Sequence, residues 1–204
     1  MIRIFRKLRN PLLLVGFAVF LAACDINAVP RLDEQVNASW SQVENQYQRR
    51  AELVPNLVAT VQGFATQERE VLQNVVEARA KVGQMQIPEN ILQNPDALQM
   101  FEQNQAALSS ALSRLLVTVE RYPDLKSNQN FLALQSQLEG TENRIAVARR
   151  DYIAAVRDYN TELRTIPGKW IAAWLYPEAE LKPSFTATVE GADRAPTVNF
   201  NSGS

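Results

Sequence analysis

The chain has 204 residues, with 21 basic and 22 acidic side chains, one cysteine and no histidine. This length suits one domain, or one domain plus a targeting segment, and the near balance of charge gives no basic field for nucleic acid. Without histidine, Ser-His-Asp and Cys-His nucleophiles are excluded, and a single cysteine cannot build an internal disulfide or a cysteine-rich zinc site. We therefore expect no enzyme, no cofactor or metal, and no nucleic-acid partner.

The first 23 residues have the pattern of a secretory signal peptide. Four basic residues and no acidic one lie in the first ten positions, and an apolar run follows over residues 11–23. A basic segment, a short apolar core and small residues at the boundary are typical of such peptides. The run is short for a membrane-spanning helix, which needs roughly 20 apolar residues.

The boundary resembles a bacterial lipobox. Leu21, Ala22, Ala23 and Cys24 follow the apolar core directly. In a lipoprotein the cysteine becomes the first residue of the mature chain and carries several fatty-acyl chains such as palmitate, which anchor stably where one chain is marginal. The alternative is an uncleaved anchor with an incidental cysteine. Both readings place the rest of the chain outside the cytoplasm, because basic residues stay on the cytoplasmic side.

Asp25 follows the cysteine and resembles the sorting signal that keeps a lipoprotein in the inner membrane. We therefore expect the periplasmic face of that membrane as the location. Removing residues 1–23 removes four basic and no acidic residues, which leaves 17 basic against 22 acidic residues in 181. Anionic headgroups should repel this acidic chain, so we expect the lipid to do the anchoring.

The first long apolar series has the alternating 4–3 spacing of a coiled-coil helix. Twelve of its fourteen positions are apolar, and Pro55 falls inside it without changing the phase. We predict one helix of about 50 residues, kinked at Pro55 and ending near Gly83. The series is Val36, Trp40, Val43, Tyr47, Arg50, Val54, Leu57, Val61, Phe64, Glu68, Val71, Val75, Ala78 and Val82.

Two charged residues occupy positions of this series. Arg50 and Glu68 can extend their stems along the edge of the seam and keep their charges in water. Alternatively, they form a buried pair that fixes the register with a partner helix.

Two more series predict two more helices. Asn94 and Pro95 are typical of a helix start, Pro123 ends the second helix, and Pro167 with Gly168 ends the third. The second series is Leu98, Phe101, Gln105, Leu108, Leu112, Leu115, Val119 and Tyr122. The third is Phe131, Leu134, Leu138, Thr141, Ile145, Ala148, Tyr152, Ala155, Tyr159, Glu162 and Ile166.

Short connections between long helices favour antiparallel neighbours. We predict an all-α, up-and-down antiparallel bundle of three long helices plus a short C-terminal helix. A short tether over residues 24–34 precedes the bundle at 35–185, and a loosely ordered tail follows at 186–204. After Pro177 we expect loose packing. An extended strand over residues 185–189 is an alternative.

Several blocks of these helices resemble the LemA family, over about residues 35–185. The blocks are residues 40–44 (WSQVE), 48–58 (QRRAELVPNLV), 77–79 (EAR), 122–126 (YPDLK), 141–152 (TENRIAVARRDY), 159–160 (YN) and 167–168 (PG), with a further likeness over residues 185–200. The resemblance implies a membrane-anchored, extracytoplasmic helical bundle without established enzymatic activity, and one branch of the family takes part in building magnetosome membranes. Members usually carry a plain transmembrane helix, and the lipobox departs from that.

A charged block on the third helix is the one candidate for polar chemistry. The favoured reading is a solvated face with salt bridges between helices, and the alternative is a polar layer that recognises a ligand. No pair of carboxylates converges locally. The block comprises Arg144, Arg149, Arg150, Asp151, Asp158 and Glu162.

The short C-terminal helix carries the partner-binding candidates Trp170, Trp174 and Tyr176. They either cap the open end of the bundle or bind something outside it, and Trp and Tyr favour headgroup depth in membranes. With three helices, this segment emerges at the end far from Cys24. A protein partner or an opposing membrane is then favoured over the membrane of the anchor.

We therefore expect a membrane-anchored helical scaffold or interaction protein, held by Cys24, whose partners and self-association stay open. The alternative is an accessory hairpin of an export or efflux assembly. Such a hairpin needs an apolar tip, which the loop over residues 84–94 could supply through Met85, Ile87 and Ile91.

Overall fold

The computed structural model of the chain describes residues 25–65, 67–88 and 90–185, and the regular structure in these ranges is entirely helical. An all-α bundle is therefore confirmed. Its helices are α2 (Ala28–Gln62), α3 (Arg69–Gln84), α4 (Pro95–Val119), α5 (Pro123–Lys126), α6 (Gln129–Arg164) and α7 (Gly168–Leu175).

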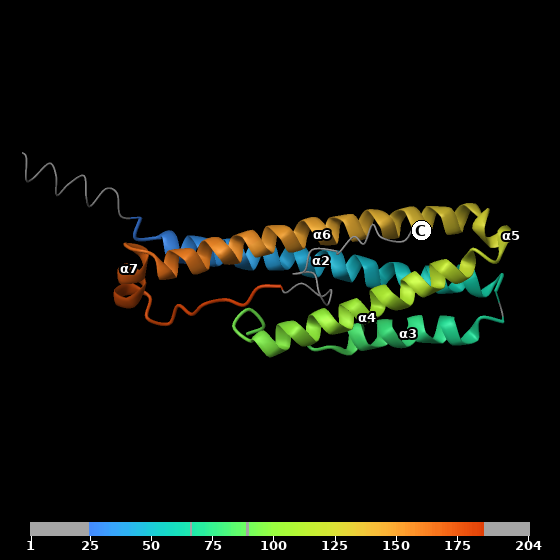
Figure 1. Cartoon of the computed structure of the whole chain (residues 1–204), viewed down its shortest axis with the longest axis horizontal. Helices are drawn as coiled ribbons and strands as arrows, with labels where there is room; N and C mark the ends of the chain where they lie inside the picture. Colours follow the sequence, from blue (N-terminus) through green and yellow to red (C-terminus); the bar gives the residue numbers. More distant parts are fainter. Residues whose placement is uncertain (1–24, 66, 89, 186–204) are drawn as a thin grey trace, which may run out of the picture.

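The long helices form two antiparallel pairs. Helix α2 packs mainly against α6, and α3 packs against α4 beneath them (Figure 1). We call the end where α2 begins, α6 ends and α7 lies the α7 end, and the opposite end the α5 end. Asn94 and Asn128 start α4 and α6 by accepting backbone N–H groups with their side chains, at 3.1 Å for Asn94 and Ala97, as predicted for Asn94.

The prediction of one continuous helix over residues 36–83 is wrong. Helix α2 continues through Pro55 but ends at Gln62, and the chain reverses into α3. The seam residues up to Val61 are all buried, whereas Phe64 is exposed and Ala65 is buried in its place. Gly63 weakens the helix at this point, and the reversal lets α3 cover α2 with Leu72, Val75 and Ala78.

The reversal moves the C-terminal helix to the opposite end from the one expected. With four long helices in place of three, α6 returns to the start of α2 (Figure 1). The Tyr176 hydroxyl donates a hydrogen bond to the Ile26 carbonyl at 3.2 Å. The prediction that residues 170–176 lie far from Cys24 is therefore wrong.

Most of the stretch predicted as a tether is helical. Helix α2 begins at Ala28, and the Ala28 N–H donates to the Asp25 carbonyl at 3.1 Å. Ala28 and Val29 are both buried. Apolar side chains at these two positions make the bundle start seven residues before the predicted boundary at residue 35.

The segment after α7 is packed, contrary to the loose packing expected after Pro177. It runs back along α6, where the Tyr152 hydroxyl donates to the Pro183 carbonyl at 2.9 Å and Asn160 exchanges two hydrogen bonds with the Lys182 backbone. Phe185 lies in the core, with its ring 5.1 Å from that of Tyr152. The predicted tail, and most of the stretch left open as a strand, lie outside the described residues.

Candidate functional site at the α7 end

Helix α7 presents its two tryptophans to solvent. It packs on the bundle through Gly168 and Ala172, which are buried, while Trp170 is 63% exposed and Trp174 is 83% exposed. A Cβ atom at Gly168 would overlap the side chain and the carbonyl oxygen of Glu162. Glycine therefore lets α7 fold closely over the end of α6 and turns the tryptophan face outward.

The third predicted partner-binding residue has a different role. Tyr176 is half-buried, and its hydrogen bond to Ile26 ties the end of α7 to the start of α2. The structure thus brings Trp170 and Trp174 together on one exposed face and places Tyr176 behind it. Helix α7 does cover the end of the bundle, as the capping interpretation expects, but Trp170 and Trp174 are exposed and take no part in that packing.

Asp25, the predicted sorting residue, lies at the same end. Asp25 is exposed, accepts the Asn27 N–H at 3.2 Å and forms an ion pair with Arg31 at 2.9 Å. Its role as a sorting signal stays a prediction. Cys24 lies outside the described residues.

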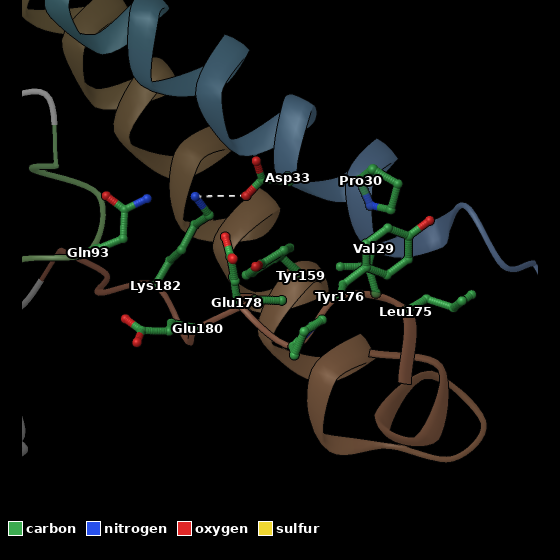
Figure 2. Close-up of a pocket in the computed structure, with 12 residues that line it drawn as sticks. Val29, Pro30, Asp33, Gln93, Tyr159, Leu175, Tyr176, Glu178, Glu180 and Lys182 are labelled. Carbon is green, nitrogen blue, oxygen red and sulfur yellow. Dashed lines mark ion pairs between the residues drawn. The ribbon is translucent and has the colours of Figure 1, made fainter. Parts of the chain in front are cut away.

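A cavity of about 460 Å³ lies between α7, α2 and the returning segment (Figure 2). Lys182 points into it and pairs with Asp33 at 2.8 Å, and its Nζ lies 5.3 Å from the centroid of the Tyr159 ring. Burial raises the pKa of Tyr159, and Asp33 and Glu180 raise it further. The pair of Lys182 with Asp33 fastens the returning segment to α2, and sequence reasoning gave no signal for it.

A polar layer divides the core into two clusters. The cluster at the α7 end contains Tyr47 and Phe101, and the cluster at the α5 end contains Val54 and Leu108. Between them lie three buried polar residues, one each from α2, α4 and α6: Arg50, Gln105 and Thr141.

Arg50 is the centre of this layer and is only 1% exposed. Its guanidinium donates to Glu142 Oε1 at 2.9 Å, to Ser109 Oγ and Gln105 Oε1 at 2.5 Å each, and to the Gln105 carbonyl at 3.1 Å. Arg50 is thus buried and forms an ion pair between helices, but its partner Glu142 is exposed. The expectation of a buried pair therefore holds for the Arg50 side alone. Glu68 instead binds Arg121 at 3.1 Å and Tyr122 at 2.8 Å at the α5 end.

The charged block of α6 does not converge on one site. Arg149 bridges to Glu102 at 2.8 Å and to the Tyr47 hydroxyl at 3.1 Å, and it stacks over Phe185 at 4.2 Å. Arg150 and Arg157 pair with the neighbouring acids Asp151 and Asp158 on the surface. A cavity of about 760 Å³ lies over Arg50 and Arg149, and both arginines are already paired with carboxylates.

The part of the chain that the structure describes holds no cluster of three or more residues of the metal-binding types His, Cys, Asp and Glu. Among the helices of that part, none combines the length and the apolar character needed to cross a bilayer.

Comparison with known families agrees with the blocks quoted above. The sequence model of the LemA family matches residues 39–200. The chain belongs to the LemA family.

Two curated relatives match a shorter stretch of this LemA family chain. They are magnetosome protein MamQ 2 and magnetosome protein MamQ 1 of Paramagnetospirillum magneticum AMB-1, and each is 38% identical over 63 residues. The match covers 31% of this chain and 23% of each relative. The chain therefore spans about a quarter of the length of the curated relatives it matches.

The loop between α3 and α4 of this LemA family member is not an apolar tip. Ile91 and Leu92 are buried in the core cluster at the α7 end, and Met85 packs against that cluster. Of the three residues expected to form the tip, Ile87 alone is exposed. Gln93 lines the same cavity as Tyr176, so the loop faces the α7 end (Figure 2). The loop over residues 84–94 therefore does not supply the distal apolar tip that the alternative of a docking hairpin expected of it.

Proposed function

We propose that this LemA family chain is a lipid-anchored scaffold on the periplasmic face of the inner membrane. Cys24 carries the lipid, Asp25 sets the location, and the helical bundle holds interaction surfaces at fixed positions above the membrane without catalysing a reaction. The observation that carries the proposal is the lipobox, which ends at Cys24. The next residue, Asp25, begins the short connection to α2.

The stiffness of the bundle supports a scaffold. Helix α2 has 35 residues and α6 has 36, so each is roughly 50 Å long at 1.5 Å per residue. The Arg50 layer links α2, α4 and α6 halfway along them. A lipid attached four residues before the start of α2 would therefore act on a rod and not on a flexible linker.

The partial match to two magnetosome proteins adds a relative with a named cellular context. The match covers too little of either relative for a binding partner of this chain to be inferred from it. We propose that this chain serves an assembly of proteins at a membrane, with partners that its own surfaces select.

The anchor is tested by treating producing cells with a signal peptidase II inhibitor such as globomycin. We expect the precursor to accumulate, and the mature chain from untreated cells to have the mass of residues 24–204 plus a diacylglyceryl group and an N-acyl group. The Cys24→Ala chain should keep its full length with or without the inhibitor. A wild-type precursor that the inhibitor does not affect, with a Cys24 thiol free to react with maleimide, would contradict lipidation.

The scaffold role is tested by photo-crosslinking in cells. A crosslinking amino acid at Val117, an exposed residue of α4, should trap the same protein repeatedly, and mass spectrometry identifies it. The same crosslinking amino acid is placed in a second chain at Asp151, which is exposed on α6, so that another helix is sampled. Absence of any reproducible crosslink from either side of the bundle would contradict a scaffold.

A further inference from the structure

The tryptophan face of α7 lies next to the residue that we expect to carry the lipid. A chain spans at most about 3.6 Å per residue, so the Ile26 Cα lies within about 7 Å of the Cys24 Cα in any conformation. Tyr176 at the end of α7 binds the Ile26 carbonyl at 3.2 Å. Helix α7 is therefore close to the membrane whenever Cys24 is in it.

Large apolar side chains gather at this end. Besides Trp170 and Trp174, three more are exposed: Leu175 at the end of α7, Ile166 just before it, and Ile26 beside Tyr176. The other large exposed apolar residues among those described are scattered, on helices at positions such as Val76, Val117 and Ile153 and singly in connections at Phe64, Ile87 and Leu181. Contiguous exposed apolar patches mark interaction sites, whereas scattered apolar residues need no explanation.

The charges around α7 suit a headgroup layer. Lys169 lies beside Trp170, Arg164 is in the last turn of α6, and both are exposed. Long basic side chains reach phosphates while their stems cover apolar surface, and Trp is enriched where hydrocarbon meets water. Among the acidic residues at this end, Glu178 and Glu180 line the cavity behind this face, and Asp25 is paired with Arg31 at 2.9 Å.

We propose that the face of α7 formed by Trp170, Trp174 and Leu175 docks into the headgroup region of the membrane that holds Cys24. The proposal rests on the proposed anchor and adds a second attachment to it. A lipid at one point leaves the bundle free to tilt, whereas a lipid together with an inserted helix face holds the rod of α2 and α6 at a fixed angle.

The size of α7 favours a lipid surface over a second protein. A stable protein interface buries about 800 Å² on each partner, and an eight-residue helix is only about 12 Å long. Membrane insertion of a few aromatic side chains needs no such area, because the lipid anchor already holds the helix at the surface.

Fluorescence quenching by brominated lipid tests the proposal on the full mature chain, purified from membranes and reconstituted into phosphatidylcholine vesicles. The chain has three tryptophans, and Trp40 is a built-in control because it is only 5% exposed in the core. We expect bromolipid to lower the fluorescence of the wild-type chain about twofold, since tryptophans at headgroup depth lie within reach of the bromines. The Trp170→Ala/Trp174→Ala chain should be unaffected.

A displaced tryptophan separates docking at α7 from general contact with lipid. Val117→Trp in the double-alanine chain places an exposed tryptophan on α4 near the α5 end. We expect no quenching there. Equal quenching at position 117 would overturn the proposal, and so would a wild-type chain whose fluorescence bromolipid leaves unchanged, whether α7 then faces water, a second copy or a protein.

Failure of the docking proposal is distinguishable from failure of the anchor. The mass of the same preparation reports lipidation, and vesicle flotation reports attachment. A lipidated chain that floats but shows unquenched tryptophans overturns docking alone, whereas a chain without lipid overturns the proposed anchor. Trp170 and Trp174 are exposed, so both alanine substitutions should leave the melting temperature unchanged.

Discussion

At the scale of single residues, the polar layer shows what a helical repeat can and cannot predict. Arg50, Gln105 and Thr141 each stand at a seam position of their own helix, and the structure places all three in one buried layer. The spacing thus predicted that they face the core. It could not predict that Glu142 pairs with Arg50, because Glu142 lies off the seam and reaches the guanidinium from the side.

Replacing Arg50 should destabilise the bundle more than replacing any exposed arginine. Arg50→Met fills most of the volume but leaves the buried Gln105 Oε1 without its donor, whereas the Gln105 carbonyl keeps its helical bond. A buried unsatisfied group costs about 1–3 kcal/mol. We expect a loss of about 3 kcal/mol in the free energy of unfolding measured with urea. Arg150→Met, on the exposed face of α6, should change it by less than about 0.5 kcal/mol. Equal losses of unfolding free energy in the two variants would contradict a stabilising role for the buried Arg50 layer.

Tyr152 should make the bundle sensitive to alkali. Burial raises the pKa of its phenol, and Glu102 raises it further. The unfolded chain therefore releases this proton near pH 10 while the folded chain keeps it, so stability is complete below about pH 10 and falls by up to about 1.4 kcal/mol per pH unit above it.

The matched variant is Tyr152→Phe, which has no phenol to titrate. At pH 7 it should be about 1 kcal/mol less stable than wild type, because it lacks the hydrogen bond to the Pro183 carbonyl. Urea unfolding between pH 9 and 11 should show this difference shrinking as the pH rises. A constant difference over that range would contradict a buried, neutral phenol.

At the scale of elements, the apolar repeat identified the buried faces of α2, α4 and α6, but it missed a chain reversal after α2 and the change of phase that comes with it. The same 4–3 spacing runs from Val36 to Val82, but α2 ends at Gln62 and α3 begins at Arg69. Both helices face one core, so their spacing stays similar across the turn. A repeat records which residues face the core and not whether the chain continues, and Gly63 was the only local signal.

The seating of α7 depends on Gly168. Gly168→Ala places a methyl group against the Glu162 carbonyl, so we expect α7 to lift and the free energy of unfolding to fall by about 1–3 kcal/mol. Gly140, inside α6, has no neighbour within 4 Å of such a methyl group, and Gly140→Ala should stabilise the chain by about 1 kcal/mol. Thermal melts of the two variants should shift in opposite directions, and shifts in the same direction would contradict this account of α7.

At the scale of the whole molecule, one missed turn reversed the position of the aromatic helix. Three long helices would place α7 far from Cys24, and four place it beside the start of α2, as the bond between Tyr176 and Ile26 shows. The all-α class and the family followed from the sequence, because apolar spacing and the quoted blocks are local. The end at which α7 lies could not be predicted from these local patterns, because it depends on whether the number of long helices before α7 is odd or even.

The central claim is that the bundle stands on the membrane with its α7 end down and its α5 end away. Cys24 is the single cysteine of the chain, and the proposed lipid would occupy its thiol, so one engineered cysteine at Glu34 or at Ser127 can carry a fluorescent donor. Energy transfer to acceptor-labelled lipid headgroups then compares the two ends in reconstituted vesicles. We predict strong transfer from position 34 and weak transfer from position 127, because α2 rises roughly 40 Å from residue 34 to its end near the α5 end. Equal transfer from the two positions would contradict the claim.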